Sequence, residues 1–156
     1  MIVVDPLQGA WELPKKLKDW GEQCSPVLEN PCLSHINFER TPVDAMSIGR
    51  LLFPEFIEYQ DAIFLKSQFS DTRFLEWLRK LKDLSAIEKV MNHIHVYDIF
   101  GYSSESTDEE FLQVANLLRR SWSISLAVSF PNYLFDVTLQ NTDQDYGPVV
   151  SFYKKR

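Results

Sequence analysis

Residues 107–130 read TDEEFLQVANLLRRSWSISLAVSF, and this stretch decides how the chain folds. It opens with a capping box, in which the side chains of Thr107 and Glu110 each accept a hydrogen bond from the other residue's backbone. Apolar residues then recur at helical spacing. They are Phe111, Val114, Ala115, Leu118 and Trp122. The pattern predicts a long amphipathic helix that begins after Thr107.

The C-terminal end of this helix is ambiguous. From Ser123 to Phe130, apolar side chains alternate with small ones at a period of two, which is typical of a strand. Leu126, however, also continues the helical stripe from Trp122. A strand here would need a tight hairpin turn at residues 131–132, where proline cannot supply the positive φ of the first position. We therefore expect the helix to continue to about residue 128.

The elements around this helix follow from caps, breakers and periodicity. We expect helices over 42–52, from Asp71 to about Lys82, and over 85–92, the last opened by a capping box at Ser85 and Glu88. We expect β structure over 56–65 with a turn or a bulge at residues 60–61, and strands over 93–100, 133–139 and 149–153.

This order predicts the α+β class. We expect a sheet of about four strands, largely antiparallel or mixed, with helices packed on one face. Residues 1–40 hold four of the eight prolines and few periodic runs. We expect them to form an irregular arm with a short helix over 15–20, whose Trp11, Leu17 and Trp20 pack on a body formed by residues 41–156. Residues 1–156 should then be a single globular domain.

Composition excludes several classes of function. The net charge of −6 argues against nucleic acid as a partner. No stretch reaches the roughly 18 apolar residues of a membrane span, and the first residues do not resemble a signal peptide. Cys24 and Cys32 have neither redox nor zinc spacing and suit a reducing compartment. We expect a cytoplasmic protein without a cofactor and without a membrane partner.

His93 and His95 are the candidates for a metal or enzyme site. Residues two apart on a strand share a face, so both imidazoles could reach one ion. A third ligand is missing, because Asp98 would point to the opposite face and His35 is distant in sequence. We therefore expect no bound metal. The two histidines remain the centre of the alternative hypothesis, an enzyme with a site assembled around them, metal-dependent or not.

The densest acidic group suggests a different function. Glu105, Asp108, Glu109 and Glu110 lie close to Tyr102. A helix N-terminus favours carboxylates, but such a patch also attracts a basic protein. Together with the absence of a catalytic motif, this predicts a non-enzymatic protein-binding or regulatory module, for example an immunity or inhibitor protein. A third hypothesis is a small-ligand pocket between the sheet and the long helix, lined by Phe and Trp.

Overall fold

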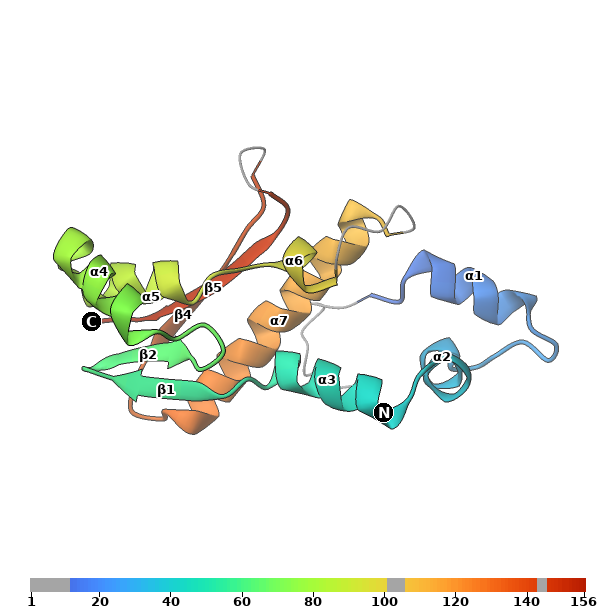
Figure 1. The fold of residues 1–156 in the computed structure, drawn as a ribbon. Coiled ribbons are helices and arrows are strands. Elements are labelled where there is room, and N and C mark those ends of the chain that lie inside the picture. The colour runs from blue at the N-terminus through green and yellow to red at the C-terminus, as the bar shows by residue number, and fades with distance from the viewer. Residues whose placement is uncertain (1–11, 101–105, 143–145) are drawn as a thin grey trace.

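The computed structural model describes residues 12–100, 106–142 and 146–156, and it confirms the α+β class (Figure 1). The helices are α1 (Lys15–Gln23), α2 (Pro31–Glu39), α3 (Pro42–Leu52), α4 (Asp71–Leu81), α5 (Leu84–Met91), α6 (Val96–Phe100) and α7 (Asp108–Ser129). The strands are β1 (Phe56–Tyr59), β2 (Ala62–Leu65), β3 (Ile94–His95), β4 (Phe135–Gln140) and β5 (Val149–Lys154).

Helix α7 forms as its sequence predicts. The Thr107 hydroxyl accepts a hydrogen bond from the Glu110 N–H at 3.2 Å, and Glu110 Oε2 accepts one from the Thr107 N–H at 2.8 Å. Residues 123–129 are helical, which confirms the expected continuation. The helical stripe places Leu126 in the core, and this burial outweighs the strand-like alternation of the same residues.

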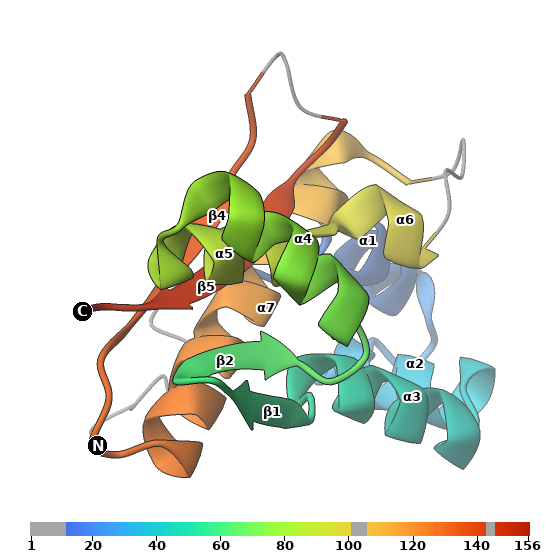
Figure 2. The same cartoon turned by 60° about the vertical axis from the view of Figure 1, so that its left-hand side comes forward.

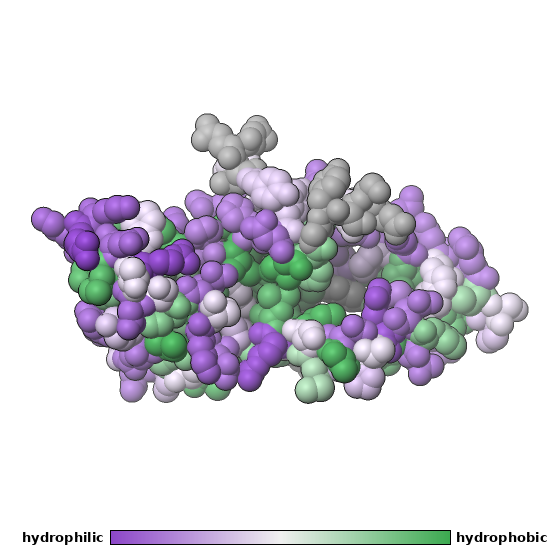
Figure 3. Space-filling model, viewed as in Figure 1, coloured by the Kyte–Doolittle hydropathy of each residue, from purple (hydrophilic) through white to green (hydrophobic). Residues whose placement is uncertain are grey.

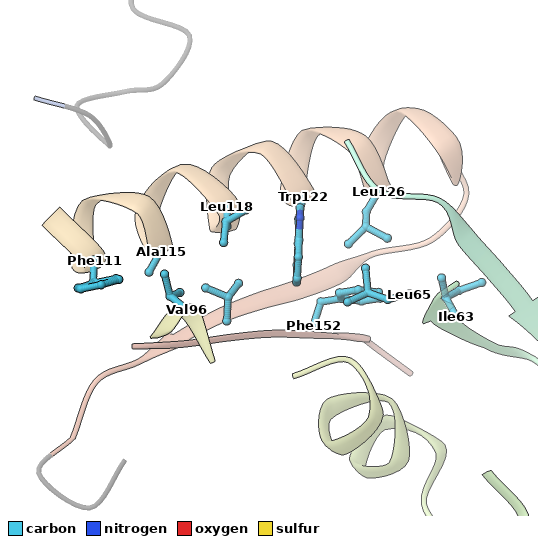
Figure 4. Packing of buried hydrophobic residues seen from close by; sticks show 10 residues of the cluster. Ile63, Leu65, Val96, Phe111, Ala115, Leu118, Trp122, Leu126 and Phe152 are labelled. Atoms are coloured by element: carbon cyan, nitrogen blue, oxygen red, sulfur yellow. The ribbon is translucent and has the colours of Figure 1, made fainter. Parts of the chain in front are cut away.

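The main core lies between α7 and the strands (Figure 4). Trp122 is the largest buried side chain, and its indole N–H donates to the backbone carbonyl of Leu51, which fixes the end of α3 against α7. Partners from β2, α6 and β5 complete the cluster. They are Ile63, Leu65, Val96, Val150 and Phe152.

A second, smaller core lies beneath α4. Ser70 caps this helix, and Phe74 is fully buried against Phe64 of the β1–β2 hairpin. Of the turn and the bulge expected at residues 60–61, the structure has the turn: it joins the β1–β2 hairpin, and Gln60 and Asp61 have φ values of 48° and 64°. Positive φ at both central residues is the conformation that two-residue hairpins of type I′ require.

The strands form two sheets, and each is smaller than the expected four-stranded sheet. One is the antiparallel hairpin β1–β2, and the other is antiparallel with the order β3-β5-β4. Helices lie on both sides of β5, with α7 above it and α5 below (Figure 4). The Ser151 hydroxyl on the lower side donates to the Lys89 carbonyl of α5. The sequence had predicted helices on one face.

The strand predicted over 93–100 is wrong. Only Ile94 and His95 are extended, opposite Val150 and Val149, and α6 follows at once. The physical reason lies at the start of β5. His95 is opposite Val149, the first residue of β5, so residues 96–100 would need partners that precede Val149. There Pro148 has no N–H to donate and Gly147 has a φ of 72°, so the pairing ends where the Val96 N–H donates to the Pro148 carbonyl.

The N-terminal arm is more helical than predicted. Helix α1 runs past Gly21, because this glycine permits a close approach, and a Cβ there would lie 2.9 Å from Cβ of Pro31. Helix α2 was not predicted. It packs beside α1 (Figure 1). Trp20 of α1 meets the ring of His35 of α2 edge-on. Trp11 lies outside the described residues.

Two further expectations concern the cysteines and membranes. Cys24 and Cys32 are free thiols in the structure. Over residues 12–100, 106–142 and 146–156, the structure contains no helix with the length and hydrophobicity needed to cross a bilayer.

Candidate functional site

The two sheets are joined by a pair of buried polar side chains on α5, which we call the α5 junction. Glu88 and Asn92 lie one helical turn apart and are fully buried. Glu88 accepts hydrogen bonds from the N–H of Ile63 at 2.7 Å and the N–H of Lys154 at 2.9 Å. It therefore links the edge of β2 to the edge of β5.

Asn92 makes a parallel set of hydrogen bonds. Its Oδ1 accepts from the Leu65 N–H at 2.9 Å, and its Nδ2 donates to the Ile63 carbonyl at 2.8 Å and the Phe152 carbonyl at 3.3 Å. Side chains thus replace the backbone of a strand between β2 and β5. Buried backbone groups need such partners, so the junction is a structural requirement.

Charged residues surround the α5 junction. Arg156 Nη1 lies 2.8 Å from Glu88 Oε2, and Lys154 Nζ lies 2.6 Å from Asp61 Oδ1. The hydrogen bond from Lys154 to Asp61, together with the lysine's charge, lowers the pKa of the Asp61 carboxyl. The lysine side chain is only 7% exposed, and Nζ also lies 4.2 Å from the ring centroid of Tyr133.

Sequence reasoning missed this junction because it assigned Glu88 to a capping box with Ser85. The cap of α5 is Asp83, whose side chain accepts from the Ala86 N–H. One signal was present in the sequence. Glu88 and Asn92 flank the buried Ile87 and Met91, and polar residues on a buried helix face have partners.

His93 and His95 line a polar pocket of about 310 Å³, which we call the histidine pocket. Its other lining residues are Gln68, Arg73, Ile94, Asp98 and Ile99. The two imidazole rings lie 5.4 Å apart, centroid to centroid, at an interplanar angle of 84°. The structure thus brings together the two histidines and Asp98, which the sequence had predicted to face away.

Backbone carbonyls fix the orientation of both rings. Nδ1 of His93 is hydrogen-bonded to the carbonyl of Val90, and Nδ1 of His95 lies 3.2 Å from the carbonyl of Tyr146. A carbonyl only accepts, so each Nδ1 carries the proton and each neutral ring presents Nε2 as a base. Among the described residues, no group of three His, Cys, Asp or Glu side chains could hold a metal ion.

The acidic group has partners of its own. Asp108 accepts a hydrogen bond from the Tyr97 hydroxyl at 2.6 Å, and Glu110 belongs to the capping box of α7. Glu109 is exposed in the first turn of α7. Glu105 and Tyr102 lie outside the described residues, so a patch that includes them stays a prediction.

A group of exposed apolar residues lies elsewhere, on α2, on α3 and at Phe53 directly after α3. We define the α2–α3 surface as six large apolar side chains that are each more than half exposed. They are Leu33 (64%), Ile36 (53%), Phe38 (69%), Val43 (69%), Met46 (73%) and Phe53 (58%). A Cβ at Gly49 would meet no atom within 4 Å, so this part of α3 is uncovered. Green residues over α3 are visible on the lower side of Figure 3.

The aromatic stripe of α7 packs into the space where the sequence had suggested a ligand pocket, and Phe111 also lines a cavity toward the N-terminal arm. Phe111 and Trp122 are buried in the core that fills the space between α7 and the sheet (Figure 4). A cavity of about 260 Å³ lies instead between α7 and the arm, where Pro14 and Lys16 approach Phe100 and Val114 (Figure 2 shows α1 behind α6 and α7).

Comparison of the chain with models of protein families, with curated proteins and with solved structures finds no match. The function must therefore be inferred from the geometry of these pockets and surfaces.

Proposed function

We propose that this protein is a non-enzymatic protein-binding module whose α2–α3 surface binds an amphipathic helix of a basic partner protein. The observation that carries the proposal is the exposure of six large apolar side chains on two helices that follow one another in the chain and at the residue that caps the second. Single exposed apolar residues are ordinary, but a contiguous group of them marks an interaction site.

The spacing on α3 favours a helical partner. Val43, Met46, Arg50 and Phe53 follow one another at intervals of 3, 4 and 3 residues. This is the spacing of the apolar seam along which two helices pack. Leu51 and Leu52 lie on the other side of α3 and pack on the core beneath α7, so α3 has one face for the body and another for a partner.

Charge favours a basic partner. The chain carries a net charge of −6. Glu29, Glu39 and Asp44 are exposed around the α2–α3 surface, where they outnumber the exposed cations Arg40 and Arg50. Acidic groups at the rim of an apolar contact speed association with a basic partner and select against acidic ones.

The test compares purified variants as bait for binding proteins. Met46→Asp places a charge in the centre of the surface, and Val128→Asp is the matched control, because Val128 is 76% exposed on α7. We expect the wild type and Val128→Asp to capture one stoichiometric basic protein from lysate and Met46→Asp to lose it.

The captured protein is then made recombinantly and titrated against the wild type. The proposal is supported if a helical segment of the captured protein binds Met46→Asp with an affinity at least about tenfold weaker than its affinity for the wild type. Equal binding by both variants contradicts it. A wild-type homodimer that Met46→Asp dissociates would also overturn it, since the surface would then bind a second copy.

The alternative hypothesis of an enzyme around His93 and His95 has one observation in its favour. Both rings are held with a basic Nε2 in the histidine pocket, as a general base requires.

A further inference from the structure

We infer that the histidine pocket is a pH-dependent binding site for a small oxyanion, specifically a phosphoryl group. This site is separate from the α2–α3 surface, and its test does not depend on the proposed protein-binding function. Its residues come from α4, β3 and α6, which the fold brings together at one end of the short strand β3.

The hydrogen bonds at Nδ1 give the two rings a specific response to protonation. In the neutral form each ring presents a lone pair at Nε2, because its single proton is on Nδ1. A second proton adds an N–H donor at Nε2 and leaves the bond to the carbonyl intact. Protonation therefore creates two charged donors without any movement of His93 or His95.

Arg73 adds a permanent positive charge. It lines the same pocket from the first turn of α4, where the helix dipole also favours an anion. The guanidinium and two imidazolium groups suit a tetrahedral oxyanion, which offers several acceptor oxygens to charged donors. The pocket volume of about 310 Å³ exceeds that of a phosphate, so a small phosphorylated molecule fits the space as well.

The remaining groups around the rings set the limits of this response. Asp98 on α6 is the carboxylate that lines the pocket, and Gln68 is neutral. The ring of Tyr146 lies 6.4 Å from that of His95. With both imidazoles protonated, the lining carries three positive charges against one negative charge. With both imidazoles neutral, the positive charge of Arg73 and the negative charge of Asp98 balance.

Binding must therefore strengthen as the pH falls through the range in which histidine gains its proton. Each charged donor to an oxyanion contributes about tenfold in affinity. We expect phosphate to bind at least about tenfold more tightly at about pH 6 than at about pH 8. Sulfate does not titrate in this range, so the same trend with sulfate assigns the pH dependence to the protein.

The experiment follows the imidazole carbon-bound proton signals of the full chain by NMR during titration with sodium phosphate, with sodium sulfate, and with sodium chloride as the ionic-strength control. A parallel titration with glycerol phosphate distinguishes a free phosphate site from one that holds a phosphorylated molecule. We expect the His93 and His95 signals to move with the oxyanions and the His35 signal to remain still. His35 lies on α2, beside Arg40.

Variants separate the contribution of the permanent charge on Arg73 from the contribution of the protons that the histidines gain. Arg73→Gln changes an exposed side chain and should weaken binding at both pH values while keeping the pH trend. His95→Gln should reduce the pH trend and leave the part that His93 contributes, and His35→Gln should change neither the affinity nor the trend. The inference is overturned by histidine signals that do not respond to the oxyanions, by an affinity that is independent of pH, or by an equal loss in His35→Gln.

Discussion

Replacing Glu88 by glutamine tests the α5 junction with the smallest change of shape. Glutamine keeps one carbonyl oxygen, but its amide group puts N–H donors where a carboxylate oxygen stood. The N–H of Ile63, at 2.7 Å, and the N–H of Lys154, at 2.9 Å, each need an acceptor at this side chain. One of the two must therefore face another donor in a site that is fully buried.

The magnitude follows from the groups left without partners. A buried N–H without an acceptor costs about 1–3 kcal/mol. The charge-assisted contact with Arg156 is also lost, although that side chain is 26% exposed and water compensates in part. We expect Glu88→Gln to lower the free energy of unfolding by about 2–4 kcal/mol, and Glu88→Ala by about 3–5 kcal/mol.

Urea unfolding followed by tryptophan fluorescence measures this difference by linear extrapolation. Glu55→Gln is the matched control. It makes the same Glu-to-Gln change at a half-exposed carboxylate, which pairs with Arg50 and Lys66. Surface pairs of this kind contribute less than about 1 kcal/mol. If Glu88→Gln costs no more than Glu55→Gln, the junction does not join the sheets as described.

Three further perturbations test the cores, the caps and the charges. Phe111→Ala should cost about 3–5 kcal/mol in urea melts, and Trp77→Ala less than half of that, because Phe111 is buried and Trp77 only partly so. Equal costs would contradict the assigned helix faces. Thr107→Ala should cost about 1 kcal/mol by the same assay, through the loss of the α7 cap, and a neutral result would mean that the cap is not used. The lowered pKa of Asp61 means that its contact with Lys154 stabilises the fold above the ordinary carboxyl range. This contribution is lost as the pH falls through the lowered value, so Asp61→Asn should flatten the dependence of the urea midpoint on pH below the ordinary carboxyl range. An unchanged slope would assign that dependence to other carboxyls.

Elements with local causes could be predicted from the sequence. The capping box of α7 and the cap of α4 involve residues three apart, and the hairpin turn at Gln60 and Asp61 is set by its own backbone. The helical stripe also settled the state of residues 123–129, since its burial gain exceeds any local preference for a strand. These features depend on short stretches of chain.

Features with distant causes could not be predicted. Glu88 meets Lys154 across 66 positions and Ile63 across 25, and no short window contains those partners. The end of β3 also has a distant cause, because its partner β5 begins only at Val149 and is preceded by Pro148. The position of Asp98 in the histidine pocket differs from the prediction because α6 stands where a strand was expected. With α6 in place of a strand, Asp98 no longer alternates to the opposite face and instead lines the pocket with His93 and His95.

The α5 junction also has a consequence for solubility. The edges of β2 and β5 that it occupies are rows of backbone donors and acceptors, and an open row of this kind is a template on which another chain adds a strand. Asn92 and Glu88 cover both edges at once. A molecule that loses α5 through local opening would therefore expose two templates together, and it would be drawn toward aggregation before the rest of the fold is lost.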